Sequence, residues 1–276
     1  MTDDTTPETA TLNFADKMSY TDYLRLDQIL SAQHPRSDAH DEMLFIIQHQ
    51  ASEIWLRLAI YELDAARDLI AKGETRMAFK MLTRVARIFE QLNSAWDVLR
   101  TMTPSEYTQF RDDLGASSGF QSHQYRLVEY MLGNRNHTLL KPHAHRSDLH
   151  EALVAELKKP SLYDTVLCAL AEKGFDVPKD VLSRDQSQKL PHSDGVEAVW
   201  QQIYQDPQTH WEAYELAEKL VDLEDYFRRW RFNHVTTVER IIGNKRGTGG
   251  TGGVSYLHKM LQVELFPELW SVRTTL

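Results

Sequence analysis

The hydrophobic positions of this chain repeat with a helical period over most of its length. From Met43 to Ile70, apolar residues recur three or four positions apart with charged residues such as Arg57 and Asp64 between them. This spacing predicts one long helix, buried most heavily at its start. The same pattern predicts further amphipathic helices at 75–101, 119–132, 147–157, 162–174, 196–205 and from about 207 to 242.

Prolines and the lack of alternating patterns favour an all-α fold. The prolines fall between the predicted helices or at their starts, where proline is tolerated: Pro104, Pro142, Pro160, Pro178 and Pro191. No stretch alternates apolar and polar residues for long enough to predict a strand. We expect one large helical domain over 20–276, preceded by a frayed segment at 1–19. The more polar stretch of about 141–194 is expected to form a small peripheral helical insert.

Composition narrows the class of protein. The 276 residues include 40 acidic and 31 basic side chains, and the resulting formal charge of -9 argues against a nucleic-acid-binding surface. Cys168 is the only cysteine, which excludes an intrachain disulfide and indicates a reducing compartment. The first residues lack the basic and apolar regions of a secretory signal, and no apolar run is long enough to cross a bilayer. We expect a cytoplasmic protein that binds neither nucleic acid nor membrane.

The stretch from Trp230 to Val254 places a histidine, His234, shortly before a basic, glycine-rich loop. Five of the seven residues at 247–253 are glycine, and they satisfy the pattern G-x-G-x-x-G. That pattern binds nucleotides only between a strand and the helix that it opens, and the residues before this loop have a helical pattern. We therefore reject a nucleotide site and expect the loop to contact another kind of ligand.

His49 and His234 both lie among bulky apolar residues on predicted helices. A neutral imidazole in such a place can bind iron through one ring nitrogen while an acceptor holds its other N–H. The alternative, favoured by spacing alone, is a hydrogen-bonded histidine of the core. His49 and Glu53 share a helix face, but one pair supplies only half a metal site. Three further histidines lie in a polar run that we expect to be a solvated loop: His143, His145 and His150.

A helix start is predicted at Thr103, where a hydroxyl N-cap is followed by proline and then by Glu106. Tyr107 and Arg111 then share one face of this helix. A guanidinium beside a phenol suits a small carboxylate, because arginine offers two parallel N–H donors and tyrosine a third. The alternative is a surface pair between Arg111 and one of the two aspartates that follow it. A turn of small residues comes next and allows the backbone to approach a flat or bulky group: Ser117, Ser118 and Gly119.

Four separated motifs together resemble the bacterial tryptophan 2,3-dioxygenases. They are FIIQHQASEIWL, TPSEYTQFRDDLGASSGFQSHQYR, LVDLEDYFRRWRFNHVTTVERIIGNKRGTGGTGGVSYL and the final FPELWSVRT. The resemblance runs from about Tyr20 to the C-terminus. It implies a homotetramer with one haem b per subunit. It also implies a reaction that inserts both atoms of O₂ across the indole C2–C3 bond of L-tryptophan. The product would be N-formyl-L-kynurenine, the first step of tryptophan catabolism by the kynurenine route.

The resemblance implies roles for residues around the cofactor and the indole. His234 matches the ligand of the haem iron, and Ser118 and Gly119 match residues beside the cofactor. His49 matches the histidine that hydrogen-bonds the indole N–H of the substrate. Phe45, one helical turn earlier, matches a residue that packs on the indole ring, and the four-residue spacing places it on the same face as His49.

Further roles are implied for the amino-acid end of the substrate. Arg111 and Tyr107 match the groups that hold its carboxylate, and Thr248 matches the hydroxyl that contacts its ammonium. The glycine loop that carries Thr248 would then act as a lid. Tyr20 and Tyr23 match aromatic residues that reach the active site of a neighbouring subunit.

Three other classes of protein remain open at this point. A haem sensor or carrier would keep the helical pocket and His234 but turn nothing over. A helical interaction protein without a cofactor is disfavoured by the glycine loop, which weakens a scaffold unless it serves a ligand. A dioxygenase acting on a broader set of indoles is disfavoured by Arg111, Tyr107 and Thr248, which together demand an α-amino acid.

Overall fold

The structure, a computed structural model, describes residues 10–243, 245–250 and 252–276, and most of these residues are helical. No strand occurs in these residues, which confirms the all-α prediction. None of their helices is long and apolar enough to cross a membrane. The α-helices are α1 Tyr20–Leu24, α2 Leu26–Ile29, α3 His40–Ala71, α4 Thr75–Leu99, α5 Pro104–Phe110, α6 His123–Met131, α7 Ser147–Leu157, α8 Leu162–Glu172, α9 Lys179–Ser183, α10 Asp194–Gln205, α11 Trp211–Ile242, α12 Val254–Met260 and α13 Pro267–Thr275. Three short 3₁₀ segments are η1 Asp112–Leu114, η2 Gly119–Gln121 and η3 His137–His143.

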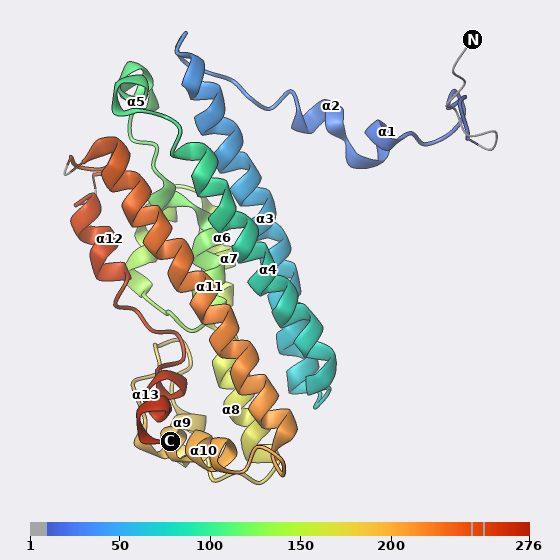
Figure 1. Cartoon of the computed structure of the whole chain (residues 1–276), viewed down its shortest axis with the longest axis vertical. Helices are drawn as coiled ribbons and strands as arrows, with labels where there is room; N and C mark the ends of the chain where they lie inside the picture. The colour runs from blue at the N-terminus through green and yellow to red at the C-terminus, as the bar shows by residue number, and fades with distance from the viewer. Residues whose placement is uncertain (1–9, 244, 251) are drawn as a thin grey trace.

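Three long helices, α3, α4 and α11, form the framework of the molecule, with α4 packed against both of the others (Figure 1). Their shared core is fully buried and includes Leu63, Leu82, Phe89 and Phe227. Burying a side chain of this size stabilises the fold by roughly 1.5–3 kcal/mol. The framework therefore holds α4 and α11 firmly side by side, and this fixes the site described below.

The burial of α3 differs from the prediction that its start is the most buried part. The buried apolar residues lie in its second half, from Leu56 to Ile70, while Met43 and Ile47 are exposed. The reason is that Phe45 and other residues of the first half line a cavity instead of packing against a neighbouring helix. The periodicity located the helix but could not distinguish a cavity wall from a packed core.

The helix boundaries agree with the predicted segments to within about two residues for α4, α7, α8 and α10, whereas α6 and α11 each begin about four residues later than predicted. The capping box predicted at Thr103 is present, because Thr103 accepts from the backbone N–H of Glu106 and the Glu106 carboxylate accepts from that of Thr103. The segment from residue 119 instead begins with a 3₁₀ turn, and Ser122 caps α6 proper. These two turns place residues 117–122 along the cavity as loop rather than helix.

The predicted insert at about 141–194 is helical and contains α7, α8 and α9. Its α8 packs on α3 and contributes Leu162, Val166 and Leu170 to the main core. Only part of the segment is therefore peripheral. The domain boundaries themselves remain a prediction.

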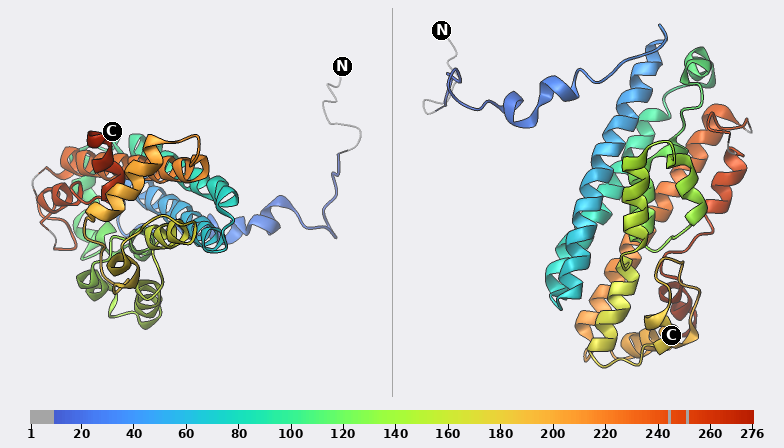
Figure 2. Two further views of the ribbon diagram at one scale, coloured as in Figure 1. Left: turned by 90° about the horizontal axis from the view of Figure 1, so that it is seen from below. Right: turned by 180° about the vertical axis from the view of Figure 1, so that it is seen from behind.

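Residues 10–39 form an arm that leaves the helical body and extends into solvent (Figures 1 and 2). The predicted frayed segment lies outside the described residues up to position 9, and residues 10–19 contain no helix. The arm carries apolar side chains that stay exposed, among them Leu12, Met18 and Leu30. Tyr20 and Tyr23 in α1 are each 74% exposed.

Candidate functional site

A cavity of about 530 Å³ lies between the first half of α3, the C-terminal part of α4 and the second half of α11. The turn at 117–122, the glycine loop and α12 complete its wall. Its volume is within the range of roughly 300–1,000 Å³ that is usual for small-molecule and cofactor sites. Apolar side chains from three helices, such as Leu56, Leu99 and Ile241, supply much of the surface, with a few polar groups among them.

His49 lies on the α3 wall of the cavity next to Phe45. The two rings are 4.1 Å apart between centroids, and Nδ1 of His49 is 2.7 Å from the carbonyl oxygen of Phe45. A carbonyl only accepts, so Nδ1 carries the proton in the neutral ring and Nε2 is left as an acceptor. Burial lowers the pKa of His49, which keeps the imidazole neutral at pH 7.

His234 lines the same cavity from α11. Burial and, to a smaller extent, the nearby His49 lower its pKa to about 4, so the imidazole is neutral. Trp96 of α4 stacks on the His234 ring at 5.1 Å with an interplanar angle of 14°, and Trp230 lies 5.4 Å away between centroids. The indole N–H of Trp96 is buried and has no hydrogen-bond partner among the described residues. A neutral imidazole packed beside two indoles at a cavity wall is suited to bind a metal ion.

Tyr107 lines the cavity and is buried, while Arg111 lies beside it outside the cavity wall. Burial raises the pKa of Tyr107, and the Arg111 guanidinium opposes that rise. Arg111 donates through Nη2 to the carbonyl oxygen of Arg246 at 2.7 Å. In the described residues Arg111 forms no ion pair with either aspartate that follows it, so the surface-pair alternative finds no support there.

The glycine loop is attached to the turn at 117–119. The Thr248 hydroxyl donates to the carbonyl oxygen of Ser117, and both residues line the cavity. Two glycines are required by geometry. A Cβ on Gly249 would lie 2.7 Å from Cβ of Ser118, and a Cβ on Gly253, where φ is +60°, would lie 2.5 Å from the Lys245 carbonyl oxygen. Ser118 and Gly119 line the cavity, and their place beside a cofactor remains a prediction.

A buried ionic group forms one wall of the cavity and was missed by the sequence analysis. The fully buried Glu129 carboxylate accepts from Arg126 and, at 2.9 Å, from Nη2 of Arg231. The Tyr125 ring lies in the same wall. The one available signal was the presence of Arg126 and Glu129 on an amphipathic helix among apolar residues, since buried charges need partners.

The Glu53 carboxylate is occupied by hydrogen bonds to two other side chains. It accepts from the Ser122 hydroxyl at 2.6 Å and from the Gln124 amide at 2.9 Å, so it joins α3 to α6. No group of three or more side chains that could hold a metal ion occurs in the described residues. The predicted alternative of a direct His49–Glu53 site therefore finds no third ligand.

The prediction of a solvated loop for the polar histidine run is wrong for His143. His145 is exposed, but His143 is buried against His123, with ring centroids 5.9 Å apart. The reason is that η3 packs on α7 and turns His143 inward, against His123 of α6. Tyr20 and Tyr23 do not line the cavity of their own chain, because they lie on the extended arm.

Comparison with known proteins decides the family. The profile of the tryptophan 2,3-dioxygenase family matches residues 5–202 and 164–276. The chain belongs to the tryptophan 2,3-dioxygenase family. A protein from Bradyrhizobium diazoefficiens named tryptophan 2,3-dioxygenase is 66% identical over 273 residues, covering 99% of this chain and 98% of its own. One of the same name from Ruegeria pomeroyi is 65% identical over 274 residues, covering 98% and 97%. One from Ralstonia pickettii is 59% identical over 267 residues, covering 97% and 96%.

Membership of the tryptophan 2,3-dioxygenase family confirms the resemblance found in the four motifs. The residues carried over from those motifs converge on one cavity, with Phe45, His49, Tyr107, His234 and Thr248 in its wall. Their individual roles remain predictions.

Proposed function

We propose that this protein is a haem-dependent dioxygenase that converts L-tryptophan to N-formyl-L-kynurenine by inserting both atoms of O₂ across the indole C2–C3 bond. The observation that supports the proposal best is the single cavity that brings together His49 from α3 and His234 from α11 in a member of this family. Both oxygen atoms end in the product, so the reaction consumes no stoichiometric reductant.

The residues of the cavity fit a haem group. His234 is buried and neutral, and it presents an imidazole to a space of about 530 Å³ whose walls are largely apolar side chains. Small residues at Ser118 and Gly119 leave room for a flat ring, and the glycine has no atom within 4 Å of a virtual Cβ. When bound, haem would supply the oxygen chemistry, while His234 would hold its iron and the cavity would supply orientation and a dry pocket.

The indole end of the substrate is oriented by α3. Nε2 of His49 is left as an acceptor by the hydrogen bond at Nδ1, so it can receive the indole N–H. The Phe45 ring beside it offers an apolar face against which an indole can pack. Fixing the reacting carbons in this way converts a bimolecular encounter into an oriented one, which accelerates reactions by a large factor.

The amino-acid end is held next to Phe45, where the Tyr107 ring lies 6.1 Å away between centroids. Arg111 and Tyr107 supply parallel and convergent donors for a carboxylate, and the Thr248 hydroxyl lies on the loop that Arg111 already contacts through Arg246. A substrate carboxylate would replace that carbonyl contact as the partner of the guanidinium. This arrangement selects an α-amino acid over a simple indole.

The assembly is proposed to be a homotetramer in which the arm of one subunit completes the site of another. The proposal is supported by the exposure of Tyr20 and Tyr23, since an extended arm with exposed aromatic residues is otherwise unfavourable. With Cys168 as the only cysteine, we propose that the protein works in the reducing cytoplasm.

The direct test uses purified protein loaded with haem, reduced without air, then given L-tryptophan and finally O₂. We expect the Soret band to shift when tryptophan is added and the product to be heavier than the substrate by two oxygen atoms. Stable haem binding without an oxygenated product would instead identify a haem sensor or carrier. Lack of haem binding would overturn the role given to His234.

A further inference from the structure

The α4–α11 interface carries a set of side-chain hydrogen bonds centred on the turn that contains His234. Nε of Arg100 donates to the Thr237 hydroxyl at 2.8 Å, and its Nη2 donates to the Thr236 hydroxyl at 2.5 Å. The same Nη2 lies 3.3 Å from the carbonyl oxygen of Asn233. We call Arg100 with these three acceptors the Arg100 clamp.

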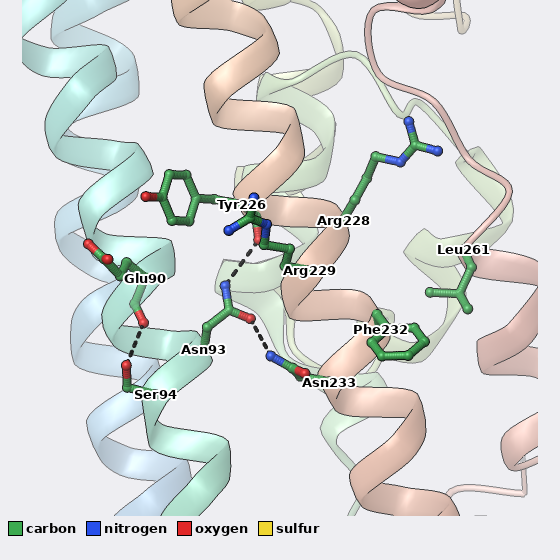
Figure 3. Close-up of a pocket in the computed structure, with 9 residues that line it drawn as sticks. All are labelled: Glu90, Asn93, Ser94, Tyr226, Arg228, Arg229, Phe232, Asn233 and Leu261. Atoms are coloured by element: carbon green, nitrogen blue, oxygen red, sulfur yellow. Dashed lines mark hydrogen bonds between the residues drawn. The ribbon is translucent and has the colours of Figure 1, made fainter.

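A second contact lies along the same interface at Asn93, two helical turns before Arg100 on α4. Nδ2 of Asn233 donates to Oδ1 of Asn93 at 2.9 Å, and Nδ2 of Asn93 donates to the Tyr226 carbonyl oxygen at 3.2 Å (Figure 3). Figure 3 shows the two amides facing each other between the helices at one end of a surface groove. Side-chain hydrogen bonds therefore join α4 to α11 at the Tyr226 carbonyl and, two helical turns later, from Asn233 to Thr237.

The α11 residues that make these contacts lie on both sides of His234 in the sequence. Asn233 comes directly before it, and Thr237, which is fully buried and lines the cavity, comes one turn after it. On α4, Asn93, Trp96 and Arg100 follow one face at the spacing of neighbouring helical turns. Trp96, between the two polar residues, stacks on the His234 ring.

We propose that Arg100, supported by Asn93, is a positioning residue that fixes the rotation of α11 about its axis and thereby aims the His234 imidazole into the cavity. The inference rests on the proposed function, in which His234 binds iron. Apolar packing between helices resists separation but only weakly resists rotation or sliding, because neighbouring ridges and grooves are similar. Three directed hydrogen bonds to one guanidinium fork do resist rotation, since a planar fork accepts only one arrangement of its partners.

The alternative is that Arg100 only strengthens the contact between two helices. Arg87 provides a matched control for this, because it also lies on α4 and donates to a residue of α11, the Tyr226 hydroxyl, at 3.0 Å. Tyr226 lies two helical turns before His234. Arg87→Met and Arg100→Met therefore each remove an arginine that links α4 to α11. Arg87 forms its link far from His234, whereas Arg100 forms its link beside His234.

The experiment compares haem release and the iron–histidine vibration in these two variants. Residues that orient a metal ligand typically change metal affinity by about 10- to 100-fold when removed. We expect Arg100→Met to release haem roughly 10- to 100-fold faster to an excess of apomyoglobin and to shift the iron–histidine band in the resonance Raman spectrum of the ferrous protein. Arg87→Met should match the wild type in both. Equal effects of the two substitutions, or no effect of Arg100→Met, would overturn the proposal.

Two further measurements keep the result interpretable. If Arg100→Met fails to fold, Thr236→Val and Thr237→Val remove single acceptors at nearly constant volume, and the same two outcomes apply to them. His234→Ala serves as the reference for the proposed function. A wild-type haem spectrum in His234→Ala would refute the ligand itself, whereas haem loss in His234→Ala with a normal Arg100→Met would refute only the positioning role.

Discussion

Nδ1 of His49 lies 2.7 Å from the carbonyl oxygen of Phe45, four residues earlier on the same helix. This bond fixes three properties of the imidazole at once. It holds the ring against the Phe45 side chain, it places the proton on Nδ1, and it leaves Nε2 as an acceptor for a donor in the cavity. The hydrogen-bonding character of His49 thus follows from the backbone of its own helix.

The first prediction concerns that acceptor. We expect His49→Ala to retain haem and to lose part of its activity toward L-tryptophan. With 1-methyl-L-tryptophan, which has no indole N–H, the wild type should lose activity while His49→Ala should show little further loss. Steady-state rates of the two proteins with the two substrates give four values, which form a double-mutant cycle between His49 and the indole N–H. A methyl effect of the same size in both proteins would show that His49 does not contact the indole nitrogen.

A second prediction addresses the carboxylate. Arg111→Ala should raise the KM for L-tryptophan by roughly 10- to 100-fold, because a carboxylate that loses a charged hydrogen-bond partner forfeits about 1.5–3 kcal/mol. Arg111→Lys should recover only part of the loss, since an ammonium cannot form two parallel bonds. The haem spectrum without substrate should be unchanged in both variants. An unaltered KM in Arg111→Ala would show that Arg111 does not hold the substrate carboxylate.

The third prediction concerns contact between the glycine loop and the turn at Ser118. An alanine at Gly249 would place its Cβ 2.7 Å from Cβ and 3.1 Å from Oγ of Ser118, so the loop must shift away. Overpacking of this kind costs about 1–3 kcal/mol. We expect Gly249→Ala to weaken tryptophan binding, measured by the substrate-induced Soret shift. Ser118→Gly in the same chain should relieve the clash and restore part of the affinity, and a double variant no better than Gly249→Ala would contradict this explanation.

A fourth prediction concerns stability and pH in the haem-free protein. The pKa of His234 is about 4 in the folded chain against 6.5 ordinarily, so between these values the unfolded chain binds a proton that the folded chain does not. Stability therefore falls as the pH drops below 6.5, by up to about 1.4 kcal/mol per pH unit, and this contribution is constant above 6.5. Urea unfolding at pH 7 and pH 5 should show a loss about 2 kcal/mol larger in the wild type than in His234→Phe. Equal losses would mean that His234 is not a buried neutral base.

Local features of the site were predictable from the sequence because they depend on short-range geometry. The capping box at Thr103 follows from residue types at fixed spacing, and so does the shared helix face of Phe45 and His49. The family motifs then located His234 and Thr248 on the cavity wall. In each case the signal lies within a few residues of the feature that it predicts.

Contacts between distant helices were not predictable in this way. The ion pair of Glu129 with Arg231 and the stacking of Trp96 on His234 join residues from different helices, and no periodicity records which faces meet. The Arg100 clamp is of the same kind. The sequence also could not show that the first half of α3 forms a cavity wall, because a cavity and a packed core require the same apolar spacing.

The last prediction tests whether the arm acts on a neighbouring subunit. Tyr20→Ala with Tyr23→Ala in one chain should lower activity while leaving haem binding intact, because the arm lies away from the cavity of its own chain. His234→Ala should be inactive but keeps an intact arm. If the arm is donated between subunits, co-expressing the two inactive chains with different affinity tags should yield mixed oligomers that regain activity, since intact cavities then receive intact arms. The control co-expresses two tagged chains that both carry all three substitutions, so that no cavity or arm in the oligomer is intact. Purified hybrids without activity would show that the tyrosines do not serve a neighbouring site.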